Sequence, residues 1–228
     1  CHGGAGQIAR VTAKGGAMAD TMIKICGLST PETLDAAVDA GATHVGFVHY
    51  EKSPRHVALE DAARLRRRVP ESVRLVLVTV AMQPEALARA YDVIKPDVIQ
   101  FHGNETPEWV ALVKQTVGVE CWRSFGLKNA GTLERARAFE GKCDRLLFDA
   151  PAQALPGGNG VTAQWELLEG WAPFMPWALA GGLGPDNVAE AIRRTRAPLV
   201  DASSGLETAP GIKNVDLIRA FCDAARAA

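Results

Sequence analysis

Residues 22–32, MIKICGLSTPE, join a short apolar strand pattern to the start of a helix. Thr30 and Pro31 are a cap residue and a first-turn proline, which mark a helix start. An open doubly wound sheet would bind dinucleotides through a G-x-G-x-x-G turn after its first strand. Cys26-Gly27-Leu28-Ser29 lacks that spacing. The junction therefore favours a closed barrel of parallel strands over an open sheet.

The same unit, an apolar run followed by an amphipathic helix, recurs along the chain. The predicted strands are Met22–Cys26, His44–Val48, Arg74–Val80, Asp97–Gln100, Val119–Ser124, Arg145–Asp149, Pro176–Ala180 and Pro198–Asp201. The predicted helices are Pro31–Ala40, Leu59–Val69, Pro84–Ile94, Pro107–Val117, Thr132–Phe139, Thr162–Gly170, Asn187–Thr195 and Val215–Ala227. No two-residue hairpin turn joins adjacent runs, which favours a parallel sheet covered by helices. The pattern predicts one α/β domain over residues 18–228, a (β/α)8 TIM barrel.

The composition, 47% hydrophobic and 22% charged residues in 228, is that of an ordinary globular protein. Its 25 basic and 26 acidic side chains give a formal charge of −1, which argues against nucleic-acid or anionic-membrane binding. The five cysteines are scattered and form no C-x-x-C pair, so neither a disulfide framework nor a zinc site is expected. We expect a cytoplasmic protein, a monomer or homodimer, whose ligand is a small molecule.

Residues 1–17 are rich in Gly and Ala and show no hydrophobic period. They lack the apolar centre of a secretory signal, and no run in the chain approaches the length of a membrane span. We interpret this segment as a disordered or upstream extension that lies outside the fold.

The residues after the last two predicted strands indicate a phosphate site. Gly181 and Gly182 follow the seventh strand, and Ser203, Ser204 and Gly205 follow the eighth. Glycines permit close backbone approach, and exposed N–H groups near a helix start attract anions. Phosphate capture after strands seven and eight is common in these barrels. Either turn alone would be unremarkable, but both together at these strand ends favour a phosphate ligand.

A further Gly-rich segment, residues 155–160, follows the sixth strand. It is either a plain flexible loop or a mobile cover over the site. As a cover, it would add Gly158 and Gly160 to the phosphate contacts.

Candidate reacting groups stand on the first and sixth strands. Lys24 and Cys26 share the face opposite Ile23 and Ile25, so they should point into the barrel, with Asp201 as a partner for the lysine. A nearby lysine could lower the pKa of the Cys26 thiol and make it a thiolate base. Asp149 ends an apolar strand, where desolvation would raise its pKa and let it hold a proton. The two groups would form a base–acid pair suited to moving a proton along a sugar.

Three further polar residues stand at neighbouring strand ends. Arg55 lies in the loop after the second strand, where its fork could bind a substrate carboxylate. Gln100 and His102 lie at the end of the fourth strand, where contact with a substrate is expected. For His102 a purely structural loop position is an equally good interpretation.

The chain resembles the phosphoribosylanthranilate isomerases of tryptophan biosynthesis from Met22 to Phe221. The segments that match are Lys24-Ile25-Cys26-Gly27-Leu28, Lys52-Ser53-Pro54-Arg55, Gln100-Phe101-His102-Gly103-Asn104-Glu105, Leu147-Phe148-Asp149, Gly157-Gly158-Asn159-Gly160, Ala180-Gly181-Gly182-Leu183 and Asp201-Ala202-Ser203-Ser204-Gly205-Leu206-Glu207. The chain departs from the usual pattern at Val161, where a lysine is common, and at Ala163-Gln164, where Phe-Asp is common.

The resemblance implies an Amadori rearrangement of N-(5-phosphoribosyl)anthranilate to 1-(2-carboxyphenylamino)-1-deoxyribulose 5-phosphate. It makes Asp149 the general acid, Cys26 the general base and Arg55 the contact for the anthranilate carboxylate. It also implies that no metal or organic cofactor takes part.

Two alternatives differ in activity. A histidine-pathway aldose–ketose isomerase of the same fold would carry aspartate where this chain has Cys26. A non-catalytic protein that binds phosphorylated ligands would have no need of both Cys26 and Asp149.

Overall fold

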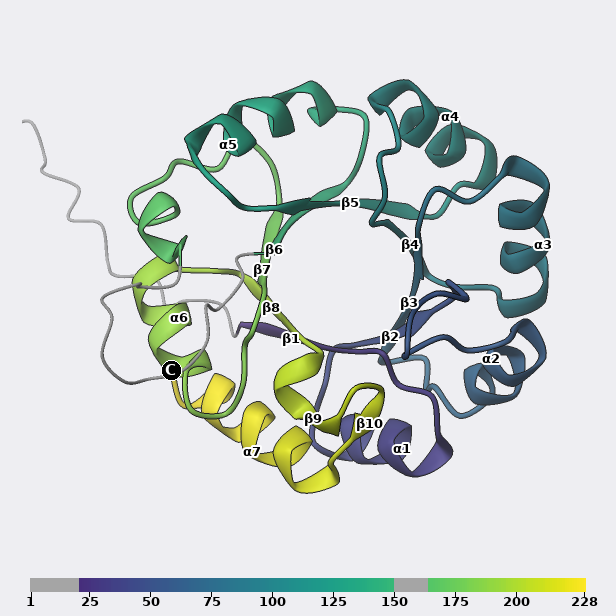
Figure 1. The fold of residues 1–228 in the computed structure, drawn as a ribbon, viewed down its shortest axis with the longest axis horizontal. Coiled ribbons are helices and arrows are strands. Elements are labelled where there is room, and N and C mark those ends of the chain that lie inside the picture. The colour runs from purple at the N-terminus through teal and green to yellow at the C-terminus, as the bar shows by residue number, and fades with distance from the viewer. Residues whose placement is uncertain (1–20, 150–163) are drawn as a thin grey trace, which may run out of the picture.

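The computed structural model describes residues 21–149 and 164–228, and these form a closed barrel of eight parallel strands (Figure 1). The strands are β1 (Met22–Cys26), β2 (His44–Val48), β3 (Arg74–Thr79), β4 (Val98–Phe101), β5 (Glu120–Gly126), β6 (Arg145–Asp149), β7 (Trp177–Ala180) and β8 (Leu199–Ala202). Each strand pairs with the next, and β1 also pairs with β8, where Lys24 stands opposite Asp201. The predicted barrel is confirmed.

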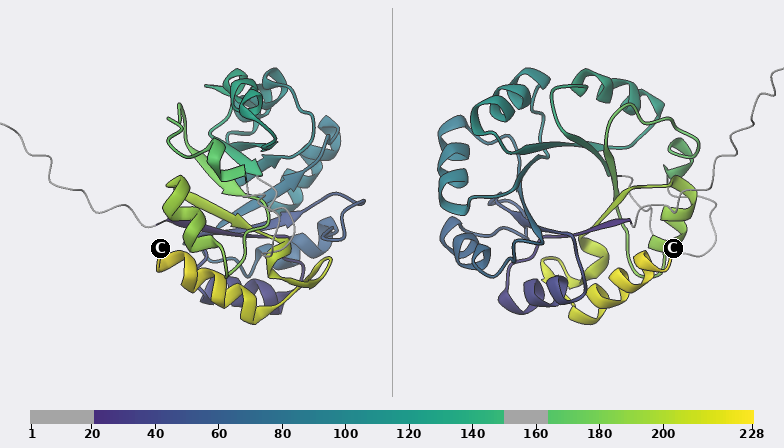
Figure 2. Two further views of the ribbon diagram at one scale, coloured as in Figure 1. Left: turned by 60° about the vertical axis from the view of Figure 1, so that its left-hand side comes forward. Right: turned by 180° about the vertical axis from the view of Figure 1, so that it is seen from behind.

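Helices surround the ring, as the two further views in Figure 2 show. They are α1 (Pro31–Asp39), α2 (Leu59–Arg66), α3 (Pro84–Ile94), α4 (Pro107–Val117), α5 (Ala130–Ala136), α6 (Val188–Thr195) and α7 (Val215–Arg226). The predicted start of α1 is confirmed, because the hydroxyl of Thr30 accepts a hydrogen bond from the Thr33 N–H and Pro31 opens the helix. The 3₁₀ helix η1 (Arg137–Phe139) extends α5.

The connection after β6 differs from the prediction. Thr162–Gly170 was expected to be helical, but Thr162 and Ala163 lie outside the described residues. The rest begins with a short 3₁₀ helix, η2 (Gln164–Leu167), and continues as turns that end at Gly170, whose φ is +70°. A left-handed glycine at that point is a common way for a helical segment to stop. Gly158 and Gly160, which were predicted to contact the phosphate, also lie outside the described residues.

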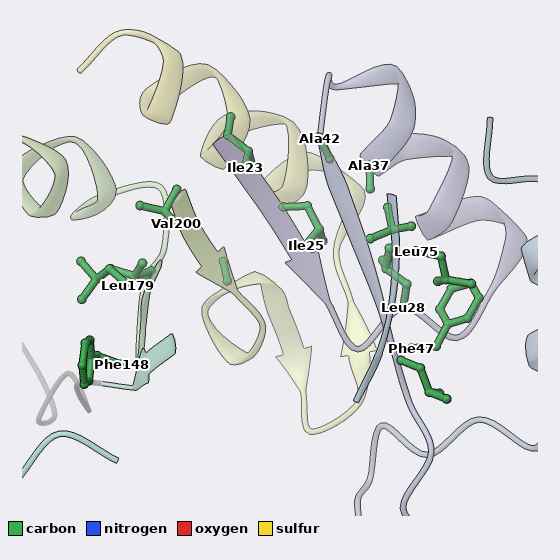
Figure 3. Packing of buried hydrophobic residues seen from close by; sticks show 14 of the residues in the cluster. Ile23, Ile25, Leu28, Ala37, Ala42, Phe47, Leu75, Phe148, Leu179 and Val200 are labelled. Carbon is green, nitrogen blue, oxygen red and sulfur yellow. The ribbon is translucent and has the colours of Figure 1, made fainter. Parts of the chain in front are cut away.

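Alternation along β1 divides its side chains between two cores. Ile23 and Ile25 belong to a large cluster between the strands and the helices, part of which is drawn in Figure 3. Lys24 and Cys26 point the other way, into the barrel, as predicted. The barrel interior is filled by a second apolar cluster that includes Val76, Val98, Trp122, Leu147 and Leu199. The interior is thus a packed core, and a ligand can bind only at the end formed by the carboxyl ends of the strands.

An antiparallel hairpin after β8 was not predicted. The 3₁₀ helix η3 (Ser204–Leu206) leads into β9 (Glu207–Ala209), and Pro210-Gly211 turns the chain back into β10 (Ile212–Lys213). Gly211 has a φ of +84°, and a Cβ there would lie 2.3 Å from the carbonyl oxygen of Pro54. The turn therefore packs directly against the loop between β2 and α2, which contains Arg55.

Candidate active site

The carboxyl ends of the strands surround a pocket of about 490 Å³, a volume that suits a small organic ligand. Nine of the predicted site residues line it: Cys26, Arg55, Gln100, His102, Asp149, Gly181, Gly182, Ser203 and Ser204. Tyr50 and Ser53 of the loop after β2 also line the pocket. Ser53 belongs to one of the matching segments, but the sequence predicted no role for either residue. The predicted residues from separate strand ends therefore face one shared space.

Cys26 ends β1 and is buried, with 7% of its surface exposed. Burial raises the pKa of the Cys26 thiol, because a thiolate loses its hydration there, and the Lys24 ammonium offsets this only in part. The expected lowering of its pKa is therefore wrong for the protein without ligand. The predicted neighbourhood of thiol and lysine is confirmed, but desolvation has the larger effect.

Lys24 forms a buried ion pair with Asp201, as predicted. Its Nζ lies 2.7 Å from Oδ2 of Asp201, and the lysine side chain has no exposed surface. Burial alone would lower the pKa of Lys24, but Asp201 and Cys26 together raise it. The other carboxylate oxygen of Asp201, Oδ1, is buried and has no hydrogen-bond partner among the described residues. Since Asp201 lines the pocket, a ligand hydroxyl is a suitable donor for that oxygen.

Replacing Lys24 with methionine should lower the free energy of unfolding by about 3–5 kcal/mol, because it leaves the Asp201 carboxylate buried without its counter-charge. Urea denaturation followed by circular dichroism measures the loss. The double variant Lys24→Met with Asp201→Asn should recover most of it. A single variant within about 0.5 kcal/mol of the parent would contradict a stabilising pair.

Asp149 ends β6 directly after three buried residues, Leu146, Leu147 and Phe148. Burial raises the pKa of the Asp149 carboxyl, and nearby His102 offsets this only in part. The predicted direction of this shift is confirmed. No described side chain donates a hydrogen bond to the carboxyl, and His102 stands exposed at the rim. An acid held in this way keeps its proton to a higher pH than a surface aspartate.

Gln100, on β4, donates a hydrogen bond from Nε2 to the Ser124 hydroxyl at 3.0 Å. Its Oε1 is buried without a partner among the described residues, so it can accept a hydrogen bond from a ligand in the pocket. The segment that carries His102 is held by Glu105, whose carboxylate accepts from the N–H groups of Ala81 (2.8 Å) and Gly103 (2.9 Å). These contacts give the rim near Gln100 a defined shape.

The predicted phosphate residues take two positions. Gly181, Gly182, Ser203 and Ser204 line the pocket, and both glycines have positive φ values, +101° and +62°. Gly205 does not line it. A Cβ on Gly205 would lie 2.1 Å from the carbonyl oxygen of Leu183, so this glycine allows the two loops to meet. In the described structure this glycine is closely packed, and its direct contact with a phosphate stays a prediction.

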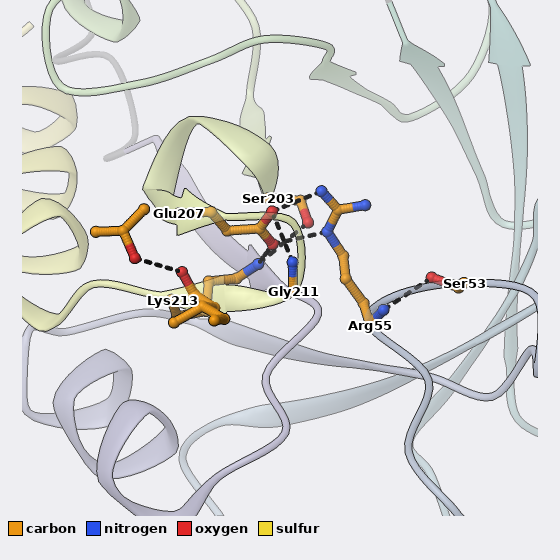
Figure 4. A network of polar contacts seen from close by, with 8 residues as sticks. Ser53, Arg55, Ser203, Glu207, Gly211 and Lys213 are labelled. Atoms are coloured by element: carbon orange, nitrogen blue, oxygen red, sulfur yellow. Dashed lines mark hydrogen bonds and ion pairs between the residues drawn. The ribbon is translucent and has the colours of Figure 1, made fainter.

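Arg55 reaches the pocket from the loop after β2, and its guanidinium already has a protein partner (Figure 4). Its Nε and Nη2 each donate to Glu207 at 2.7 Å. Glu207 also binds Lys213, whose Nζ lies 3.4 Å from the Ser203 hydroxyl. Lys213 lies in a hairpin beyond the last predicted strand end, so the strand-end pattern did not predict it. The Pro210-Gly211 turn is the sequence signal for that hairpin.

Within residues 21–149 and 164–228, no three His, Cys, Asp or Glu side chains lie together in a group that could hold a metal ion. In the same ranges, no helix is long and apolar enough to cross a bilayer.

A closed parallel barrel with a pocket at the carboxyl ends of its strands is the architecture of the (β/α)8-barrel enzymes. A family model described as N-(5'phosphoribosyl)anthranilate (PRA) isomerase matches residues 23–224. The chain belongs to this isomerase family.

Individual relatives agree with this assignment. An N-(5'-phosphoribosyl)anthranilate isomerase of Erythrobacter litoralis is 63% identical over 206 residues, which are 90% of this chain and 99% of the relative. The crystal structure of phosphoribosyl anthranilate isomerase from Thermotoga maritima is 32% identical with a TM-score of 0.82, and the match covers 91% of this chain and 100% of the other. A structure of the enzyme in complex with reduced 1-(o-carboxyphenylamino)-1-deoxyribulose 5-phosphate has a TM-score of 0.80 at 32% identity, with the same coverage.

Proposed function

We propose that the protein catalyses the Amadori rearrangement of N-(5-phosphoribosyl)anthranilate to 1-(2-carboxyphenylamino)-1-deoxyribulose 5-phosphate in tryptophan biosynthesis. The observation that supports this most directly is one pocket lined by both the Cys26 thiol and the Asp149 carboxyl. Membership of the isomerase family and the likeness to a structure with a reduced product analogue support the choice of substrate.

The substrate has two anionic ends, and the pocket offers a suitable contact for each. The phosphate would lie against the turns after β7 and β8, where Gly181, Gly182, Ser203 and Ser204 line the wall. Such turns let backbone N–H groups approach an anion closely. Gly158 and Gly160 belong to the same proposed phosphate site. The anthranilate carboxylate would lie against Arg55.

The first chemical step is opening of the ribose ring. Asp149 donates its proton to the ring oxygen, the bond from that oxygen to C1 breaks, and the nitrogen lone pair forms an iminium bond to C1. The raised pKa of Asp149 favours this role, because a larger fraction of the carboxyl is protonated near neutral pH. Gln100 and His102 would contact the substrate beside this group.

The second step is removal of the C2 proton by Cys26. The electrons of that C–H bond form a C1–C2 double bond and neutralise the iminium nitrogen, and the resulting enolamine tautomerises to the ketone. Burial raises the pKa of the Cys26 thiol in the free protein, so formation of the thiolate needs positive charge nearby. Lys24 supplies part of it, and the iminium formed in the first step supplies more.

The histidine-pathway isomerase remains the alternative enzyme, and Cys26 argues against it. The decisive assay adds freshly prepared phosphoribosylanthranilate to the purified protein and follows the loss of anthranilate fluorescence. Turnover supports the proposal. Conversion of the histidine intermediate without turnover of phosphoribosylanthranilate would replace it, and no turnover of either would favour a binding protein.

The rate should depend on pH as a bell whose acidic limb belongs to Asp149 and whose alkaline limb belongs to Cys26. An ordinary carboxyl titrates about 4–5 pH units below an ordinary thiol. Burial raises the pKa of both groups, and we expect Asp149 to remain the first to lose its proton. The reactive form, a protonated Asp149 beside a Cys26 thiolate, is therefore a minor species that is most populated between the two pKa values.

The variants separate the two limbs in measurements of kcat/KM against pH. The residual activity of Asp149→Asn should rise with pH until Cys26 is ionised. This rise should report the pKa of Cys26, and the limb at the pKa of Asp149 should be absent. Residual activity of Cys26→Ser should fall as Asp149 ionises. A wild-type acidic limb that persists unchanged in Asp149→Asn would assign it to another group, such as the substrate phosphate, whose second pKa is about 6.

We also place the enzyme in the cytoplasm, as a monomer or homodimer. The four cysteines within the described residues are all free and buried, which suits a reducing compartment.

A further inference from the structure

Hairpin β9–β10 contributes two charged side chains that the chemical steps above do not use. Glu207 and Lys213 are almost completely buried, with side-chain exposures of 4% and 1%. They form a cluster with Arg55, drawn in Figure 4. A buried negative charge and a buried positive charge beside a half-buried arginine are costly to desolvate at the edge of a pocket, so their arrangement calls for a functional explanation.

Glu207 is the centre of this cluster. Its Oε1 accepts hydrogen bonds from Nε of Arg55 and from Nζ of Lys213. Its Oε2 accepts from Nη2 of Arg55 at 2.7 Å and from the Gly211 N–H at 3.2 Å. Burial alone would raise the pKa of Glu207, but these donors lower it to about 2. The carboxylate therefore stays ionised and fixed in place across the working pH range.

The contacts with Glu207 leave one side of the Arg55 guanidinium free. Nε and Nη2 face Glu207, whereas Nη1 has no hydrogen-bond partner among the described residues. Figure 4 shows this terminal nitrogen pointing away from Glu207. A guanidinium has five N–H donors in a planar fork, so the Nη1–Nη2 edge can still bind a second carboxylate with two hydrogen bonds.

The aliphatic part of the Arg55 side chain is packed as closely as its guanidinium. A Cβ on Gly27 would lie 2.7 Å from Cδ of Arg55 and 3.2 Å from both Nζ of Lys213 and Oγ of Ser203. Gly211 packs against the carbonyl of Pro54, the residue that precedes Arg55. Arg55 has little freedom to turn, so the direction of its free edge is set by the hairpin.

From these contacts we propose that Glu207 is a positioning residue: it orients Arg55 so that the Nη1–Nη2 edge meets the aromatic carboxylate, and so makes the enzyme specific for ortho-carboxylated arylamine substrates. The inference rests on the proposed function, because it takes the carboxylate contact of Arg55 from there. A fixed fork binds a carboxylate more tightly than a mobile one, since less conformational entropy is lost on binding.

The variant Glu207→Gln separates positioning from simple electrostatics because the two predict opposite results. Removing a negative charge beside an anion site should tighten anion binding if charge alone matters. If Glu207 positions Arg55, the amide NH₂ of glutamine faces donors instead of accepting from them, Arg55 loses its orientation, and carboxylate binding weakens.

The experiment compares the affinities of two ligands by calorimetry. One is reduced 1-(o-carboxyphenylamino)-1-deoxyribulose 5-phosphate, and the other is the corresponding phenylamino compound without the carboxylate. The wild type should prefer the carboxylated ligand by about 10- to 100-fold, the range of charge-assisted hydrogen bonds. In Glu207→Gln that preference should fall below about 3-fold, with the affinity for the phenylamino compound unchanged within about 2-fold.

Turnover provides a second measurement. KM for phosphoribosylanthranilate should rise about 10-fold in Glu207→Gln, and kcat should fall less than about 3-fold, as for an interaction made equally in ground and transition state. Glu207→Asp keeps the charge but withdraws the carboxylate by one methylene, so it should lose part of the preference. Glu169→Gln is the matched control, since Glu169 pairs with Arg194 on the outside of the barrel and should change nothing.

A preference that survives in both Glu207 variants would overturn the inference. An equal loss of affinity for both ligands would also overturn it, because that result indicates general damage to the pocket. If the predicted loss of preference occurs in a protein that does not turn over phosphoribosylanthranilate, the positioning role stands and the proposed function fails.

Discussion

Asp149→Asn should lower kcat for phosphoribosylanthranilate by about 10²–10⁴-fold, the usual contribution of a general acid. Asparagine keeps the shape of the side chain but has no proton to give to the ribose ring oxygen, so ring opening loses its catalyst. Asp149 forms no hydrogen bond with another described side chain, so the substitution should leave the fold intact. The kinetics are measured by the loss of anthranilate fluorescence.

Two controls distinguish lost chemistry from lost structure. Asp149→Asn should bind reduced 1-(o-carboxyphenylamino)-1-deoxyribulose 5-phosphate within about 3-fold of the wild type, because a general acid contributes mainly in the transition state. Asp92→Asn makes the same chemical change on the exposed face of α3 and should be fully active. Activity of Asp149→Asn within tenfold of the wild type would remove Asp149 from the acid role.

Cys26→Ser should also cost about 10²–10⁴-fold in kcat. A serine hydroxyl fits the site but ionises far less readily than a thiol, so the C2 proton has no effective base. The variant should open the ring and bind the product analogue, yet fail to complete the isomerisation. Cys222→Ala is a suitable control, because Cys222 is buried in α7 on the helical side of the barrel.

Alkylation gives an independent test of Cys26. Burial raises the pKa of Cys121 and Cys143 to about 12 and that of Cys222 to about 11, so these thiols should react slowly at neutral pH. Burial raises the pKa of the Cys26 thiol as well, but among the described cysteines it is the one that lines the pocket, so a reagent should reach it first and the product analogue should protect it. Alkylation of another described cysteine before Cys26 would argue against an accessible, ionisable thiol at the end of β1.

The strand ends could be predicted from the sequence because alternation is a strong local signal. The apolar side chains of Ile23 and Ile25 were expected to face the helices. Because side chains alternate along a strand, Lys24 and Cys26 then had to face the inside of the barrel. Once the strands form a ring, their carboxyl ends converge, and nine predicted residues consequently line one pocket. Local pattern and topology were sufficient for this part of the site.

Other properties depend on contacts that no local pattern contains. The pKa of Cys26 depends on a balance between desolvation and the Lys24 charge, and only the packed structure shows that desolvation has the larger effect. The occupied edge of Arg55 depends on Glu207, 152 residues further along the chain. Gly205 belongs to a Ser-Ser-Gly turn whose composition is typical of an anion site, but only the packed structure shows that the Leu183 carbonyl lies against it.

The pairing of Lys24 with Asp201 also has a consequence for how the molecule is assembled. The two residues are 177 positions apart and join the first strand to the last, at the seam where the ring closes. A nascent chain that has not yet emerged as far as β8 has no carboxylate at this position for Lys24. Burying the ammonium before that moment would be strongly unfavourable, and bringing such distant segments together is entropically slow. We therefore expect closure of the ring and formation of the Lys24–Asp201 pair beneath Cys26 to be one late, cooperative event, so that a partly folded intermediate has no preformed catalytic centre.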